Sequence, residues 1–270
     1  MDCHNAPRIR AKGNPGLHLE TGAVVSRFSR ITRVAVTGST NDDMARMLGE
    51  EHARGLTLVA DYQERGSGRK GRSWLAAPGS ALLCTIALPD PLPAAHLWAV
   101  PFWSACIVRD ALEACGVSGT RLQWPNDVLS ADGRKIAGIL CISRVAGEYA
   151  WAGCGIGVNV RRPQDAALYE EIVPPPAFAT DFADVDRDTL LEALLRAADT
   201  QYSLLETPPA IVQHWEPLAN VPGQPYRILK DGETQPFDAA ALRLLPGGSL
   251  LVQSGDEQRE ISLADARALR

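Results

Sequence analysis

A pair of apolar segments in the middle of the chain constrains the fold most. Residues 135–143 (KIAGILCIS) and 149–160 (YAWAGCGIGVNV) are joined around Gly147, an arrangement typical of an antiparallel hairpin. Glycine occupies every second position from Gly153 to Gly157, so one face of the second strand carries no side chains. That face either allows another element to pack closely or leaves room for a flat ligand, and the spacing taken alone favours close packing.

Other segments predict an α+β domain around this hairpin. Further strands are expected at residues 56–62, 80–88 and 121–124. Helices are expected from Ser39 or Thr40 to Gly55, over 93–116 with a kink at Pro101, over 187–205 and over 210–219. Residues 163–183 contain three consecutive prolines and predict a long loop. The whole segment from 24 to 220 is expected to form one domain behind a loose N-terminal arm, residues 1–23.

The last fifty residues have a different sequence pattern from the rest of the chain. After residue 221, short apolar runs alternate with turn signals at 231–232, 247–248 and 254–255. Closely spaced short strands of this kind predict a small five-stranded barrel over residues 221–270.

Composition excludes several classes of protein. With 27 basic and 32 acidic residues, the net charge of −5 argues against broad nucleic-acid binding. The longest nearly apolar run, residues 97–108, is shorter than the roughly 18 residues that a membrane-spanning helix needs. No secretory signal is visible, and six cysteines without a C-x-x-C pair are expected to be free thiols in a reducing cytoplasm. The scattered histidines argue against a zinc site.

The segment from Asp61 to Trp74 (DYQERGSGRKGRSW) combines many charged side chains with glycines. Four cations and one anion lie between Glu64 and Arg72, interleaved with three glycines. Guanidinium groups suit phosphate or carboxylate oxygens, and glycines let backbone N–H groups approach a ligand. A solvated, mobile basic loop is the alternative. The glycines fit G-x-G-x-x-G, but Pro78 and Gly79 leave no room for the helix of a dinucleotide-binding unit, and no G-K-[ST] of a P-loop occurs.

A second segment combines a turn with a charged residue. Residues 124–127 (WPND) are a turn signal. Lys135 then opens a strand whose next seven residues are apolar or glycine. Such an ammonium either guards a strand edge against aggregation or faces an anion as a fixed charge, and the spacing leaves both interpretations open.

Taken together, these segments resemble the biotin protein ligases. The matching motifs are residues 38–41, 61–74, 124–127, 134–140 and 155–159, which follow the family's order and spacing from about residue 34 to 160. The resemblance implies an α+β catalytic domain on a mixed sheet with an SH3-like barrel at the C-terminus. It also implies ATP, Mg²⁺ and biotin as ligands, activation of biotin as biotinyl-5'-AMP, and transfer to a lysine of a biotin carboxyl carrier domain.

The resemblance also implies roles for individual residues. Lys135 and Arg69 would be catalytic. The biotin-binding set would be Ser39, Thr40, Asn41, Gln63, Ser67, Gly68, Arg69, Lys135, Gly155 and Gly157. The ATP-binding set would be Arg69, Arg72, Trp74, Asn126, Asp127, Lys135 and Asn159. No protein side chain is expected to hold a metal, although Asp127 is a candidate for orienting Arg69 or Mg²⁺.

The sequence departs from the family pattern at several positions, and other functions fit some of its motifs. Ser67 and Gln123 stand where many members have a basic residue, and the turn at 130–133 is one residue longer. The segment before Ser39 is too short for the helix-turn-helix of members that double as repressors, so no operator-DNA or membrane binding is expected. The alternatives are a lipoate-protein ligase and a non-catalytic biotin sensor. The sequence does not identify the acceptor protein. It also does not decide between a monomer and a homodimer.

Overall fold

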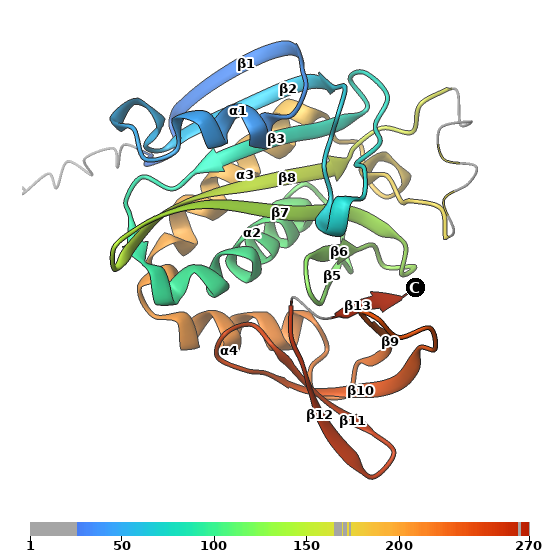
Figure 1. Cartoon of the computed structure of the whole chain (residues 1–270). Helices are drawn as coiled ribbons and strands as arrows, with labels where there is room; N and C mark the ends of the chain where they lie inside the picture. Colours follow the sequence, from blue (N-terminus) through green and yellow to red (C-terminus); the bar gives the residue numbers. More distant parts are fainter. Residues whose placement is uncertain (1–25, 165–168, 170–171, 173, 264–265, 270) are drawn as a thin grey trace, which may run out of the picture.

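The computed structural model describes residues 26–164, 169, 172, 174–263 and 266–269. Its larger part is a mixed eight-stranded sheet in the order β1-β2-β3-β8-β7-β6-β5, with β4 paired to β8 (Figure 1). The strands are β1 Arg30–Thr37, β2 Leu56–Gln63, β3 Ala81–Ala87, β4 Leu92–Pro93, β5 Arg121–Gln123, β6 Asp127–Leu129, β7 Lys135–Ala146 and β8 Tyr149–Asn159. The prediction of an α+β fold on a mixed sheet is confirmed. The predicted arm over residues 1–23 lies outside the described residues.

The predicted hairpin is the centre of the sheet. β7 and β8 pair antiparallel from Ala137 opposite Val158 to Ala146 opposite Tyr149. On the other side of β8 lies β3, whose seven residues are all buried. A strand that is covered on both faces reads as a continuous apolar run, which is why these segments stand out in the sequence.

Helix α1, Thr40–Met47, connects the parallel strands β1 and β2. Ser39 is its N-cap, as predicted, and its side chain accepts from the backbone N–H of Asp42. The prediction that this helix runs to Gly55 was wrong. Leu48 already has an extended backbone and Gly49 has φ +98°, so the helix ends there and a short 3₁₀ turn, η1 Glu51–Ala53, precedes β2.

Two helices cover the sheet face opposite α1 (Figure 1). The single kinked helix predicted over 93–116 was wrong: a 3₁₀ segment, η3 Ala94–Ala99, leads into α2, Val100–Ala114. Pro101 stands in the first turn of α2, where its missing N–H costs nothing, so no kink is needed. The helix α3, Arg187–Gln201, packs on α2 and gives way to a 3₁₀ turn, η6 Tyr202–Glu206, before the predicted end at residue 205. Residues 179–181 form a further 3₁₀ turn, η5 Ala179–Asp181, inside the predicted long loop.

A second, smaller sheet follows α4, Pro208–Leu218. Its antiparallel order is β12-β11-β10-β9-β13, which agrees with the expected SH3-like unit. The strands are β9 Pro225–Lys230, β10 Phe237–Leu244, β11 Leu250–Ser254, β12 Glu257–Ile261 and β13 Ala266–Leu269. The boundary between the two units, at residue 220 or 221, stays a prediction.

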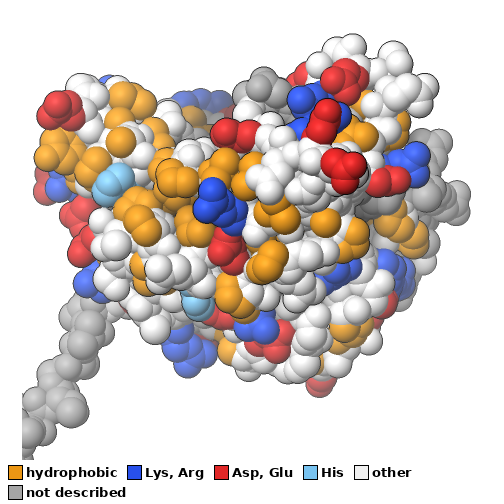
Figure 2. All heavy atoms as spheres, turned by 90° about the horizontal axis from the view of Figure 1, so that it is seen from below, with side chains coloured by type: hydrophobic (Ala, Val, Ile, Leu, Met, Phe, Trp, Pro, Cys, Tyr) orange, Lys and Arg blue, Asp and Glu red, His pale blue; other side chains and the backbone are white. Residues whose placement is uncertain are grey.

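The described residues show how surface charges and thiols are distributed. On the face seen from below, acidic, basic and apolar side chains are interspersed (Figure 2). Cys84, Cys106, Cys115, Cys141 and Cys154 are free. Burial raises the pKa of Cys84 to about 12, which keeps its thiol protonated and unreactive. Within the described residues, none of the helices has the length and apolar character needed to cross a bilayer.

The two sheets are joined through Trp124, which is fully buried. Its indole Nε1–H donates to the backbone oxygen of Gly248 at 3.0 Å, and its backbone N–H donates to the Tyr226 hydroxyl at 3.0 Å. Burial raises the pKa of Tyr226 to about 12, so the phenol is neutral. The turn at 124–127 is thereby fixed by the smaller unit.

Replacing Tyr226 with Phe tests this junction. The variant leaves the buried N–H of Trp124 without its acceptor, so the free energy of unfolding is expected to fall by about 1–3 kcal/mol. Urea unfolding followed by far-UV circular dichroism measures the change. Tyr149→Phe is the matched control, because the Tyr149 side chain is exposed and its loss of a hydroxyl costs little. Equal stability of the two variants would contradict the assigned role of the Tyr226 hydroxyl.

Candidate active site

A pocket of about 440 Å³ lies on the sheet face that carries α1. All the site residues named from the sequence line it except Asp127, which stands directly behind Lys135. The lining residues that were expected are Ser39, Thr40, Asn41, Gln63, Ser67, Gly68, Arg69, Arg72, Trp74, Asn126, Lys135, Gly155, Gly157 and Asn159. Segments more than a hundred residues apart in the sequence therefore meet in one cavity.

The glycine face of β8 forms the floor. A Cβ on Gly157 would lie 2.6 Å from the Trp74 ring, and one on Gly138 of the neighbouring strand would lie 3.0 Å from it. A Cβ on Gly155 would overlap the side-chain amide of Asn41. Close packing, the interpretation that the spacing favours, is therefore what these glycines permit. Because the side chains packed on them line the pocket, the same glycines also shape it.

One end of the pocket is a network of neutral polar groups. Gln63 Oε1 accepts from the backbone N–H of Thr40 at 2.7 Å and from the Thr40 hydroxyl at 2.9 Å. The Thr85 hydroxyl lies 2.8 Å from both Thr40 Oγ1 and Asn41 Oδ1. Asn41 Nδ2 donates to the backbone oxygen of Leu140 at 2.9 Å. These bonds orient the amides and hydroxyls without any formal charge.

The other end is cationic. Lys135 Nζ lies 2.7 Å from Asp127 Oδ1 and 5.4 Å from the centroid of the Trp74 ring. The Lys135 side chain is 21% exposed and that of Asp127 is 11% exposed. Between the two interpretations left open by the sequence, the position in the pocket wall favours a fixed charge facing a ligand. Asn126 donates from Nδ2 to the backbone oxygen of Ile139 at 2.8 Å, which holds the turn against β7.

The glycine-rich segment after β2 forms an ordered hairpin at the cationic end. Gly68 donates its N–H to the Arg72 backbone oxygen at 2.6 Å, and Trp74 donates to that of Gly66 at 2.8 Å. A short 3₁₀ turn, η2 Arg69–Gly71, forms its tip. The basic loop is thus built into the pocket wall.

Arg69 is the desolvated cation of this loop. Its guanidinium donates to the backbone oxygen of Leu263 in the smaller unit. Burial lowers the pKa of Arg69 from the ordinary guanidinium value, the nearby Arg72 lowers it further, and Asp127 and Asp231 act in the opposite direction. Arginine stays charged under these conditions. A charge that has lost part of its water interacts strongly with an anion brought beside it.

Sequence reasoning missed several contributors. Thr85 is hidden in a strand that reads as uniformly buried, and only its hydroxyl inside an apolar run could have signalled a polar role. The segment after β8, for which the sequence predicts only a loop, also lines the pocket. Its lining residues are Tyr169, Ile172, Pro174 and Pro176. Asp127 pairs with Lys135, a contact that the turn signal at 124–127 did not suggest.

The arrangement suits an elongated ligand with a neutral polar head and an anionic tail. Cations at one end can also accept phosphate groups. In the part of the chain that the structure describes, no three His, Cys, Asp or Glu side chains are grouped as ligands for a metal ion. A divalent cation would therefore have to arrive with phosphate groups that supply most of its ligands.

Comparison with known proteins identifies a matching family model and relatives of similar sequence. The model of the Biotin/lipoate A/B protein ligase family matches residues 34–159. The chain is 27% identical over 226 residues to the bifunctional ligase/repressor BirA of Escherichia coli, covering 82% of this chain and 68% of that protein. It is 32% identical over 183 residues to the biotin–[acetyl-CoA-carboxylase] ligase of Mycobacterium tuberculosis, covering 65% of each.

A solved structure shares the fold. The biotin protein ligase from Aquifex aeolicus in complex with biotin and ATP superposes with a TM-score of 0.71 at 24% identity, covering 90% of this chain and all of that one. At this level of identity the likeness establishes the fold.

Thr85→Val tests whether the neutral network is a real structural unit. Valine keeps the shape but leaves Asn41 and Thr40 short of a partner, so the free energy of unfolding is expected to fall by about 1–2 kcal/mol. Thr57→Val is the matched control. Thr57 is equally buried, and its hydroxyl has no hydrogen-bond partner among the described residues, so this variant is expected to lose no more than about 0.5 kcal/mol. Chemical denaturation measures both, and equal losses would contradict the network.

Proposed function

Because residues 34–159 match the model of the Biotin/lipoate A/B protein ligase family, we propose that the protein is an ATP-dependent biotin protein ligase. It activates biotin as biotinyl-5'-AMP and transfers it to a lysine of a biotin carboxyl carrier domain. One observation carries the proposal: a neutral amide and hydroxyl network, which meets β7 at Leu140, and two fixed cations, one of them Lys135 at the first residue of β7, line one 440 Å³ pocket.

The neutral end fits the ureido head of biotin. A ureido group has one carbonyl acceptor and two N–H donors, and Thr40, Asn41 and Gln63 supply groups of both kinds. The dithiolane ring of lipoate has no N–H or carbonyl group that could exchange hydrogen bonds with these side chains, so it gains less from this end of the pocket. The network therefore favours biotin over lipoate, the alternative within the same family.

The cationic end fits the first reaction. The biotin carboxylate attacks the α-phosphorus of ATP, a P–O bond to the α-phosphate forms, and pyrophosphate leaves. Two anions must first approach each other. Lys135 and Arg69 line the wall where this occurs, and fixed cations lower the repulsion and stabilise the charge that develops in the transition state. Asp127 holds the Lys135 ammonium in place, and Mg²⁺ would be bound mainly by the phosphates.

The second reaction needs an activated acyl group that water cannot reach. The neutral amine of the acceptor lysine attacks the biotinyl carbonyl, an amide forms, and AMP leaves while the amine loses a proton to solvent. Residues 64–73 form one wall of the pocket and limit the access of water to the mixed anhydride. A non-catalytic biotin sensor would not need both Lys135 and Arg69 beside the carboxylate.

We further propose a cytoplasmic location, because the described cysteines are free and a carrier domain of a carboxylase is the proposed acceptor.

Lys135→Gln tests the proposed chemistry. Loss of one fixed charge that stabilises a transition state costs about 100-fold or more, so biotin-dependent ATP–pyrophosphate exchange is expected to fall at least about 100-fold. Lys230→Gln, on the smaller sheet, is the matched control and is expected to keep the exchange rate. Because Lys135→Gln leaves Asp127 without its ion-pair partner, the thermal midpoint is measured alongside. A folded variant with nearly normal exchange would remove Lys135 from the reaction.

Ligand choice tests the function against its alternatives. Isothermal titration is expected to show micromolar binding of biotin and none of lipoate or octanoate. Tight binding of lipoate would support the lipoate-ligase alternative. Biotin binding without any pyrophosphate exchange would support a sensor.

A further inference from the structure

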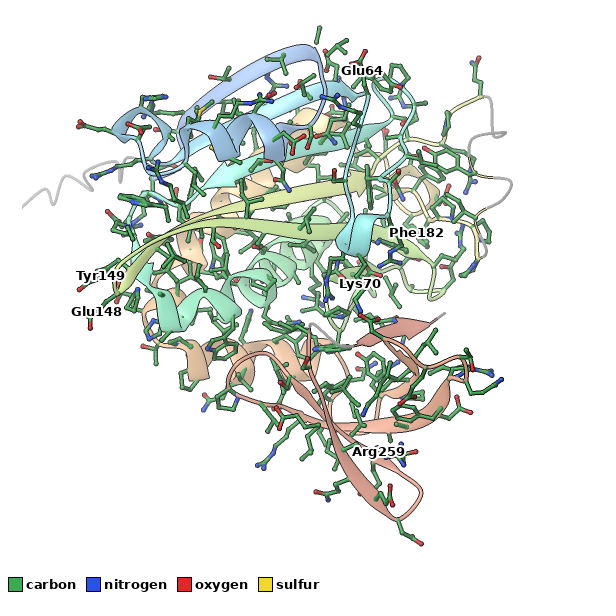
Figure 3. The ribbon with its side chains drawn as sticks, viewed as in Figure 1. Glu64, Lys70, Glu148, Tyr149, Phe182 and Arg259 are labelled. Atoms are coloured by element: carbon green, nitrogen blue, oxygen red, sulfur yellow. The ribbon has the colours of Figure 1, made fainter. Side chains whose placement is uncertain are left out.

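The tip of the glycine-rich loop is attached to the smaller sheet at two points. Lys70 Nζ lies 2.6 Å from both carboxylate oxygens of Asp231, which stands in the turn after β9. The Arg69 guanidinium donates to the backbone oxygen of Leu263, which follows β12. Figure 3 shows Lys70 at the tip of the loop, where it faces the smaller sheet.

The backbone at this tip is held in an unfavourable conformation. Lys70 has φ 56° and ψ 41°, in the left-handed region that residues with a Cβ seldom adopt. Such a conformation persists when the surroundings fix it by several contacts. The Asp231 carboxylate, bound through both oxygens, is the contact that fixes the side chain of this residue.

Lys70 and Arg69 are adjacent in the tip, and both reach the smaller sheet, Lys70 through Asp231 and Arg69 through the backbone oxygen of Leu263. The Arg69 side chain also lines the pocket. If Lys70 left the left-handed region, the direction of the chain at Arg69 would change. The ion pair between Lys70 and Asp231, two residues 161 positions apart in the sequence, is therefore coupled to the position of the pocket residue Arg69.

We propose that Asp231 is a positioning residue that keeps the glycine-rich loop closed over the pocket while the acyl-adenylate is bound. This inference rests on the proposed function, which supplies the adenylate. Asp231 acts through Lys70 and Arg69 and does not touch the substrates. The Lys70 and Asp231 side chains are 27% and 55% exposed, so the pair contributes little to global stability, and its loss is expected to show in loop closure.

The variants are made in the full chain. Asp231→Asn removes the charge at constant shape, and Asp231→Glu keeps it. The exchange of charges in the double variant Lys70→Asp, Asp231→Lys restores attraction with the partners reversed. Glu257→Gln is the matched control, because it breaks an exposed ion pair with Arg259 (2.7 Å) in the same small sheet, away from the loop.

Two measurements are made on each variant. The first is the rate at which labelled biotinyl-AMP, formed from biotin and ATP with pyrophosphatase, leaves the protein after dilution into unlabelled biotin. The second is tryptic cleavage after Arg69 and Arg72 in the ligand-free protein, which reports opening of the loop without any catalysis. An exposed ion pair shifts such an equilibrium by up to about fivefold.

Asp231→Asn is expected to speed adenylate release and cleavage by about three- to fivefold, with the thermal midpoint unchanged. Asp231→Glu and the charge exchange are expected to bring the rates of release and cleavage most of the way back to the wild-type values. Glu257→Gln is expected to match wild type. Release and cleavage at the wild-type rate in Asp231→Asn would overturn the inference, and so would a charge exchange that behaves like Asp231→Asn. If the wild type formed no adenylate, the proposed function would fail, and unchanged cleavage would separately refute the closure of the loop by Asp231.

Discussion

The ion pair between Lys135 and Asp127 is the constraint on which the rest of the site depends. Asp127 opens β6 and its side chain is only 11% exposed, so its carboxylate needs a partner, and Lys135 at the start of β7 supplies it at 2.7 Å. The pairing of β6 with β7 shifts register between Val128 and Leu129, and Lys135 lies opposite Leu129, two residues along β6 from Asp127. The ammonium is thus held at one place in the pocket wall, close to the ring of Trp74.

The two faces of the large sheet have different roles, because one packs against helices and the other carries the pocket. α2 and α3 bury one face of the sheet, whereas on the other face glycines admit the side chains of Asn41 and Trp74, which line the pocket. Side chains from distant segments then line the cavity above those glycines. A rigid sheet whose glycines let pocket side chains pack closely can hold a neutral network and a pair of cations in fixed positions, which is what joining two anionic substrates requires.

Much of this could be predicted from local sequence. The hairpin of β7 and β8 follows from two apolar runs, the start of α1 from Ser39, and the pocket residues from the motifs and their resemblance to a family. Other features depend on contacts that no local pattern encodes. Thr85 joins Thr40 and Asn41 of α1, and Lys70 meets Asp231 from another unit. The end of α1 does have a local signal, because Gly49 takes a positive φ, and the prediction of a helix to Gly55 passed over it.

The central claim is that a single pocket joins the biotin carboxylate to the α-phosphate and keeps the product from water. A single-turnover experiment tests it most directly, with protein in excess over ATP labelled at the α-phosphate, in the presence of biotin and Mg²⁺. The account predicts that the label becomes protein-bound biotinyl-AMP and is released as AMP only when a biotin carboxyl carrier domain is added. Label that stays in ATP, or that becomes free AMP or ADP at the same rate without biotin, would contradict it.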